Sequence, residues 1–219
     1  MPLSEEQVRH LHTLRMKSGD ALELLFSSGV WRADLAELGR HRAMVCLVSP
    51  LHENREAPFP IHGLLPITAQ LNLWDEWLPP LVELGITLIQ PVVFSRSEFD
   101  GCKVSSRRNR WERIIQSAVE QSHRSRIPEL RDPIPFRDLL AWKAPQKWLA
   151  YEVQVSDANP ILRRDAMAFT SGPEGGLTKE EFESLREAGW EAVALGKSIL
   201  RAVTAPIALL GAIRFQWHL

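Results

Sequence analysis

From about residue 61 onward, short apolar segments alternate with helical segments, and this alternation constrains the fold more than any other feature of the chain. The expected strands are 62–67, 86–94, 148–153, 166–170 and 192–195, and the expected helices are 71–84, 107–122, 135–142, 179–188 and 204–217. Strands that alternate with helices pair in parallel, with helices covering both faces of the sheet. The sequence therefore predicts an α/β domain over residues 61–219.

The first 58 residues have a different pattern. A short helix is expected over residues 4–17, because Ser4 can cap it and acidic residues fill its first turn. Three strand-like segments follow, at 21–26, 31–38 and 42–48. Several short strands in so small a space predict a small barrel or an open sheet. The stretch 50–60 contains three prolines and reads as a linker.

Charge and cysteine content narrow the class of function. The net charge is −1, which argues against binding of nucleic acid through an overall positive charge. Binding through a local basic patch remains open. No window approaches the roughly 20 apolar residues needed to cross a bilayer. The two cysteines and seven histidines show no metal-ligand spacing, so we expect no metal site and a reducing, cytoplasmic environment. Basic residues do gather in one stretch: Lys103, Arg107, Arg108, Arg110, Arg113, Arg124 and Arg126.

A glycine-rich turn between residues 170 and 181 is the most informative segment. An expected strand runs into Ser171-Gly-Pro-Glu-Gly-Gly176, and Thr178 with Glu181 then forms a capping box that opens a helix. Glycines permit positive φ and let a ligand approach bare backbone amides. A tight strand-to-helix turn without a ligand has the same composition, so the segment alone leaves both interpretations open.

Two further segments can carry chemistry. Leu195-Gly196 ends a short strand, and Arg201 stands before an apolar helix, where it either extends to the surface or grips a carboxylate or phosphate. In the expected helix around 110–124, one side is apolar and a neighbouring stripe is polar. That stripe is either a solvated face or, through Gln121 and Arg124, a reader of a base or a phosphate.

Four blocks of sequence together carry a family resemblance. They are His10-Leu-His-Thr-Leu-Arg15-Met-Lys-Ser-Gly19-Asp20; Glu83-Leu-Gly-Ile86 with Pro91 and Arg96-Ser97; Arg110-Trp111 through Ala118-Val-Glu120-Gln121-Ser122-His-Arg124 with Ile127-Pro128; and Gly172–Gly176 with Leu195-Gly196, Ile199-Leu200-Arg201 and Thr204-Ala205. With these blocks the chain resembles the bacterial 16S ribosomal RNA N3-methyluridine methyltransferases, the RsmE family of the SPOUT superfamily.

The resemblance implies a PUA-like RNA-binding barrel over residues 1–58, which either lacks its first strand or closes differently, and a trefoil-knot SPOUT methyltransferase domain over 61–219. It implies a homodimer that binds S-adenosylmethionine and methylates ribosomal RNA of the small subunit. The implied cofactor-binding residues are Tyr151, Ser171, Gly172, Pro173, Glu174, Gly175, Gly176, Leu195, Gly196, Ile199, Leu200 and Arg201. The implied RNA-binding residues are Arg15, Lys17, Arg96, Arg110 and Arg113.

Methylation of uridine N3 requires that its proton be removed or its anion stabilised. The implied catalytic residues are Arg201, Glu120, Gln121 and Arg124: the arginines near the target phosphate or uracil oxygens, and Glu120 as the proton acceptor.

The chain also departs from the family pattern in two places. Ala202-Val203-Thr204-Ala205 replaces Thr-Glu-Thr-Ala, so one carboxylate is missing, and Pro79-Pro80 is expected to shorten or kink its helix. A non-catalytic RNA-binding relative and a methyltransferase with another RNA target remain alternatives.

Overall fold

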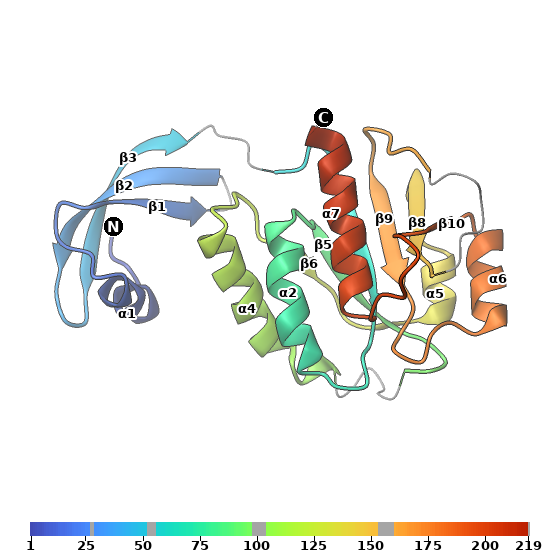
Figure 1. Cartoon of the computed structure of the whole chain (residues 1–219). Helices are drawn as coiled ribbons and strands as arrows, with labels where there is room; N and C mark the ends of the chain where they lie inside the picture. The colour runs from blue at the N-terminus through green and yellow to red at the C-terminus, as the bar shows by residue number, and fades with distance from the viewer. Residues whose placement is uncertain (27–28, 52–55, 98–103, 153–159, 219) are drawn as a thin grey trace. The chain divides into compact units, whose positions relative to one another are not determined.

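The structure is a computed structural model that describes residues 1–26, 29–51, 56–97, 104–152 and 160–218. The chain divides into two compact units, Met1–Arg55 and Glu56–Leu219 (Figure 1). The alternating pattern at the start of the sequence analysis lies entirely in the second unit. Each unit has its own core and is described separately.

The first unit contains a helix and a three-stranded antiparallel sheet. Helix α1 (Glu5–Thr13) begins at the predicted cap, where Ser4 Oγ accepts a hydrogen bond from the Gln7 backbone amide. The strands are β1 (Ala21–Phe26), β2 (Gly29–Leu38) and β3 (Ala43–Leu51), in the order β1-β2-β3. Buried side chains from the helix meet buried side chains of β2 and β3 in a small core: Val8, Leu11, Ala33, Leu35, Ala43 and Val45.

The second unit is built on a seven-stranded sheet in which all the described strand pairs are parallel. Its order is β10-β8-β9-β4-β5-β6, and β7 also pairs with β5. The strands are β4 (Ile61–Pro66), β5 (Leu88–Val93), β6 (Glu129–Leu130), β7 (Ile134–Pro135), β8 (Gln146–Ala150), β9 (Met167–Ser171) and β10 (Glu191–Val193). The predicted parallel α/β organisation is thereby observed, and the two-residue strands β6 and β7 are additional to it.

Helices cover both faces of this sheet. Figure 1 shows α2 (Leu73–Glu83), α4 (Arg108–Gln121) and α7 (Thr204–His218) together on one face. On the other face, α5 (Phe136–Leu140) and α6 (Lys179–Glu187) contribute Leu139 and Leu185 to a core shared with the sheet. Because all the paired strands run in one direction, their carboxyl ends form a single edge.

Pro79 and Pro80 do not end their helix, and the alternative expectation of a kink stays a prediction. Both prolines lie inside α2, which continues to Glu83. A proline in a helix interior costs about 3 kcal/mol or more because a backbone hydrogen bond is lost. Burial of an apolar face of α2 against its neighbours outweighs that cost. The buried residues of this face are Trp74, Trp77, Leu78, Leu81 and Val82.

Candidate functional site

A cavity of about 620 Å³ lies at the carboxyl edge of the sheet, where β8, β9 and β10 end. Its walls come from the segments that directly follow these strands, together with the first residue of α2 and the start of α7. Ligands of open α/β sheets bind outside the carboxyl ends of the strands, where loops present backbone groups. The position of the cavity therefore fits a small-molecule site.

The glycine turn after β9 forms one wall, and its conformation requires glycine. Gly176 has φ +69°, and its amide donates to the Pro173 carbonyl at 2.8 Å, which closes the turn. A side chain at Gly172 would come within 3.2 Å of Leu177 Cγ. The capping box then opens α6 as predicted, with Thr178 Oγ1 accepting from the Glu181 amide at 3.1 Å.

The loops that follow β4 and β5 hold this turn in place. Arg96, after β5, donates from Nη1 to the Gly175 carbonyl, and its aliphatic carbons lie over Gly175. After β4, the Ala69 amide donates to Glu174 Oε1 at 3.2 Å. The Ser95 amide donates to buried Glu181 Oε1 at 2.9 Å. The turn is thus fixed before any ligand arrives, which lowers the ordering cost of binding.

One cavity-lining hydroxyl has no partner. Ser171 is 1% exposed, and its Oγ makes no hydrogen bond within the described residues. An unpaired buried polar group costs about 1–3 kcal/mol, so such groups normally have a partner. A polar ligand in the cavity would supply one. On the same wall the Tyr151 ring stacks on Phe182, with centroids 4.2 Å apart. Burial raises the pKa of the Tyr151 phenol, with a smaller contribution from Glu152, and keeps the phenol neutral.

The segment between β10 and α7 forms the opposite wall. Gly196 has φ +116°, a conformation that L side chains rarely adopt. The buried Trp77 indole donates to the Val203 carbonyl at 2.6 Å and so anchors the end of this segment to α2. Arg201 lines the cavity with an exposed side chain, while its carbonyl accepts from the Thr204 and Ala205 amides at the start of α7.

Every predicted cofactor-binding residue lines this one cavity: Tyr151, Ser171, Gly172, Pro173, Glu174, Gly175, Gly176, Leu195, Gly196, Ile199, Leu200 and Arg201. The sequence reasoning missed further lining residues, namely Leu73, Ala150, Glu152, Leu177, Ser198, Ala202, Val203 and Ala205. Glu152 was recognisable as the residue after Tyr151, whereas Leu73 is far from the other segments in sequence and no local signal indicated it.

The four predicted catalytic residues do not lie together within one chain. Arg124 is 5% exposed and donates to the Glu56 carboxylate and to the carbonyls of Val82, at 3.0 Å, and Ile86, at 2.8 Å. Those carbonyls precede β5, so Arg124 lies at the amino edge of the sheet, opposite the cavity. Glu120 and Gln121 lie at the same end, on exposed positions of α4.

Within one chain these three residues therefore lie apart from Arg201, and the catalytic role predicted for them stays a prediction. The guanidinium of Arg124 is occupied by buried acceptors. Burial tends to raise the pKa of Glu56, but hydrogen bonds and charge from Arg124, together with hydrogen bonds from Ser125, outweigh it and hold that pKa below its ordinary value.

The predicted RNA-binding residues fall into two groups. Arg15 and Lys17 are exposed in the first unit, just after α1. In the second unit each of the three arginines has a protein partner. Arg96 holds the glycine turn, Arg110 Nε pairs with Asp75 Oδ2 at 2.8 Å, and Arg113 Nε donates to the Asn109 carbonyl at 3.2 Å.

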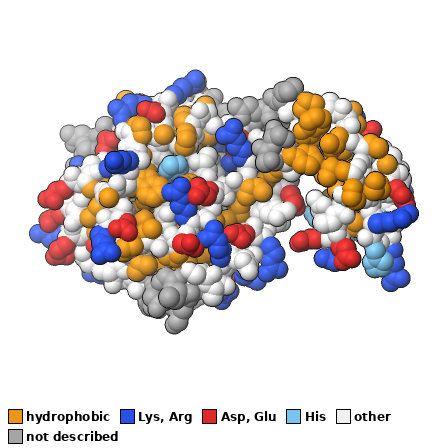
Figure 2. Space-filling view, turned by 180° about the vertical axis from the view of Figure 1, so that it is seen from behind, with side chains coloured by type: hydrophobic (Ala, Val, Ile, Leu, Met, Phe, Trp, Pro, Cys, Tyr) orange, Lys and Arg blue, Asp and Glu red, His pale blue; other side chains and the backbone are white. Residues whose placement is uncertain are grey.

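Two of the three arginines of α4 are thus paired with carboxylates, because Arg108 also pairs with Glu112 and Asp132. Figure 2 shows acidic and basic side chains interspersed over the visible face of the larger unit. Among the residues that the structure describes there is no cluster suited to a metal ion, and none of their helices is long and apolar enough to cross a membrane.

Comparison with known proteins identifies the family. A model of an RNA methyltransferase domain matches residues 55–214, and a model of an RNA methyltransferase PUA domain matches residues 3–45. The ribosomal RNA small subunit methyltransferase E of Synechocystis is 31% identical over 96% of this chain and 71% of that protein. The chain belongs to this family of RNA methyltransferases. Its Bacillus subtilis member is 28% identical over 99% of this chain and 90% of that protein.

Solved structures of family members agree with the fold. The Neisseria gonorrhoeae ribosomal RNA small subunit methyltransferase E, bound to S-adenosyl methionine, superposes with a TM-score of 0.86 at 32% identity, covering 99% of this chain and 92% of that one. A Legionella pneumophila methyltransferase in complex with the same cofactor gives 0.86 at 29% identity, covering 98% and 91%. The predicted fold class, a SPOUT methyltransferase domain with an N-terminal PUA-like domain, is confirmed.

Proposed function

We propose that this methyltransferase uses S-adenosylmethionine to methylate N3 of a uridine in 16S ribosomal RNA. The observation that carries the proposal is the convergence of all twelve predicted cofactor-binding residues on one cavity at the carboxyl edge of the sheet. The family to which the chain belongs, and the cofactor bound in two of its solved relatives, support the same reaction.

The cavity fits the cofactor on the chemistry of its own groups. The unpaired Ser171 hydroxyl and the bare backbone of Gly172–Gly176 offer donors and acceptors for a nucleoside. S-adenosylmethionine supplies an electrophilic methyl group on its sulfonium sulfur. Displacement at that carbon is in line, so the residues that fix the walls accelerate it chiefly by positioning. Arg96, Glu174 and Trp77 fix those walls.

Arg201 is the residue placed to act on the substrate. Its exposed guanidinium stands at the cavity, where a fork of donors can bind the target phosphate or the uracil oxygens as N3 loses its proton. Glu120 is replaced as candidate proton acceptor by the carboxylates that line the cavity among the described residues, Glu152 and Glu174. Val203, which stands where the family has glutamate, contributes its carbonyl to the Trp77 indole, so the backbone anchor does not require a carboxylate there.

A homodimer is part of the same proposal. Helix α7 is apolar almost all round, and a helix of that kind is normally buried. The side chains of Leu209, Leu210 and Ile213 are buried in this chain, but Phe215 is 67% exposed. Ile199, which lines the cavity, is 83% exposed. A second copy seated on α7 would cover this surface. Phe215→Glu should convert a dimer to a monomer in light scattering, and a wild-type monomer would contradict this part of the proposal.

The target position can be mapped directly. Methylation of N3 removes a Watson–Crick donor, so reverse transcription stops at the modified nucleotide. Small subunits and naked 16S RNA, both lacking the modification, should be incubated with the protein and cofactor and then copied. A single new stop at a uridine supports the proposal. New stops elsewhere would indicate another target, and cofactor binding without any modification would favour the non-catalytic alternative.

The expected cytoplasmic location of the protein stays a prediction.

A further inference from the structure

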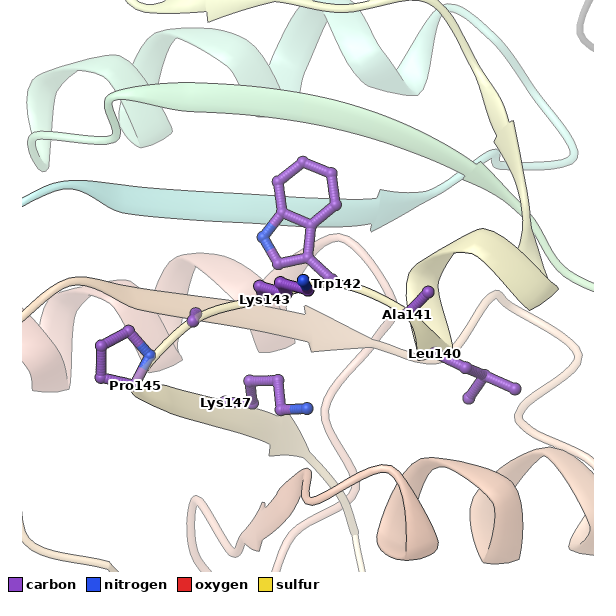
Figure 3. A pocket seen from close by; sticks show the side chains of 7 residues that line it. Leu140, Ala141, Trp142, Lys143, Pro145 and Lys147 are labelled. Carbon is purple, nitrogen blue, oxygen red and sulfur yellow. The ribbon is translucent and has the colours of Figure 1, made fainter.

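A second cavity lies at the opposite end of β8 from the cofactor cavity. It is wide open to solvent, has a volume of about 550 Å³ and is lined by the segment that joins α5 to β8 and by the start of β8: Leu140, Ala141, Trp142, Lys143, Ala144, Pro145 and Lys147. Figure 3 shows this segment leaving α5 at Leu140 and turning back into the strand after Pro145, with the Trp142 ring directed away from Lys147. Strand β8 spans five residues, about 16 Å at 3.3 Å per residue, and separates the two cavities.

Two lysines line this second cavity, and one arginine lies beside it. Lys143 is exposed and has no ion pair within the described residues. Lys147 donates to the Ala188 carbonyl at the end of α6, which engages one of its three N–H groups. Arg163, from the segment before β9, donates from Nη2 to the Pro145 carbonyl at 2.8 Å, so its guanidinium lies at the wall.

The position of Arg163 is fixed by a buried amide. The Gln146 side chain is 3% exposed; its Nε2 donates to the Arg163 carbonyl at 2.9 Å, and its Oε1 accepts from the Arg163 amide at 2.7 Å. The segment around Arg163 is thereby tied to the start of β8. The third cation is therefore part of the local fold rather than a loose surface side chain.

The charge balance here differs from that of α4. No acidic side chain is among the residues lining this cavity, whereas Arg108, Arg110 and Arg124 each pair with a carboxylate. An RNA-binding protein with a net charge of −1 must concentrate positive charge locally. The cationic residues around Pro145 meet that requirement.

We propose that this cavity holds the phosphate backbone of the substrate RNA at a point away from the methylated nucleotide. The inference rests on the proposed function for its RNA ligand. Lys143 and Arg163 contact phosphate oxygens, and the apolar floor formed by Leu140, Ala141, Ala144 and Pro145 accommodates ribose or base. Phosphate contacts of this kind fix register without reading sequence.

The test compares RNA binding by wild type, Lys143→Gln, Arg163→Gln and the double variant. Affinity for transcribed 16S RNA is measured by filter binding at several KCl concentrations. Each lost phosphate contact should make the slope of log K against log salt shallower by about 0.7–0.9, so the loss of affinity relative to wild type should be about threefold larger at 50 mM than at 200 mM KCl. Lys179→Gln, at an exposed lysine paired with Glu183 on α6, is the matched control and should keep the wild-type slope.

The outcomes separate this inference from the proposed function. A Lys143→Gln slope equal to wild type, or a Lys179→Gln slope that changes as much, overturns the inference. Thermal unfolding checks that Arg163→Gln remains folded, and Lys143→Gln alone decides the case if it does not. Absence of transfer by wild type would contradict the proposed function, while the binding slopes still decide the role of the cavity.

Discussion

Arg96 Nη1 donates a hydrogen bond to the Gly175 carbonyl and links the loop after β5 to the glycine turn after β9. The two strands are not neighbours, because β4 lies between them. The side chain thus fixes one wall of the cavity from outside it. Arg96, which was predicted to bind RNA, therefore contacts the glycine turn.

Arg96→Ala should weaken S-adenosylmethionine binding about fivefold, because loss of one net hydrogen bond of about 1 kcal/mol lets the glycine turn move. The rate at saturating cofactor should stay near wild type, since the residue does not touch the reacting atoms. Calorimetric titration and steady-state kinetics measure the two effects. Arg137→Ala, at an exposed arginine 3.6 Å from Asp138, is the control. Unchanged cofactor affinity in Arg96→Ala would refute the positioning role.

Ser171→Ala tests whether the unpaired hydroxyl awaits the cofactor. Removing a buried group without a partner should leave the free energy of unfolding unchanged or raise it by about 1 kcal/mol. Cofactor affinity should nevertheless fall about fivefold, as a hydrogen bond to the ligand is lost. Thermal denaturation and calorimetry read the two quantities separately. A variant that is less stable and binds cofactor normally would show that the hydroxyl serves the fold.

The buried Arg124–Glu56 pair predicts a stability effect with a defined pH dependence. Glu56→Gln should lower the free energy of unfolding by about 3–5 kcal/mol at pH 7, because the Arg124 charge is left buried and unpaired. The pKa of Glu56 in the folded protein lies below its ordinary value of 4.5, so its stabilisation is complete above that pH and is lost as pH falls through the folded-state pKa.

The difference between wild type and Glu56→Gln in urea denaturation should therefore shrink in acid. An equal difference at pH 7 and at the lowest pH where wild type still folds would argue against this account. Lys179→Gln, outside the pair, should show no such trend.

Substitutions of Arg201 and Glu120 should differ in their effect on the rate of methyl transfer. Arg201→Ala should reduce methyl transfer by roughly 100-fold, the scale on which removal of one donor to a developing anion reduces rate. Glu120→Ala should remain close to wild type, since Glu120 lies on an exposed position of α4 near the amino edge of the sheet. Single-turnover rates at saturating cofactor and RNA provide the comparison. Comparable losses in the two variants would restore Glu120 to the site.

Much of the fold was readable from sequence because local signals and burial agree. The capping boxes at Ser4 and Thr178 mark the starts of α1 and α6, and apolar segments mark the core strands. Strands β6 and β7 were missed because two residues carry no periodicity. Helix α2 contradicted the expectation from its two prolines, because a buried tryptophan-rich face is a tertiary effect that local propensity omits.

The site was predictable only in part, for a related reason. Turns such as Gly172–Gly176 leave a signature in residue type, and the family resemblance built on such segments named twelve residues that line one cavity. The role of an arginine depends on what it meets in three dimensions. Arg124 and Arg110 are residues of the type expected in an RNA-binding stripe. Each instead pairs with a carboxylate from a segment distant in sequence, Arg124 with Glu56 and Arg110 with Asp75. Sequence spacing does not contain that information.

The most direct test of the central claim is transfer of labelled methyl from S-adenosylmethionine to small ribosomal subunits that lack N3-methyluridine, followed by digestion and nucleoside chromatography. We predict that wild type places the label in N3-methyluridine and that Arg201→Ala, measured beside it, places about 100-fold less per unit time. Label in any other nucleoside, or no label from a protein that binds the cofactor, would contradict the account.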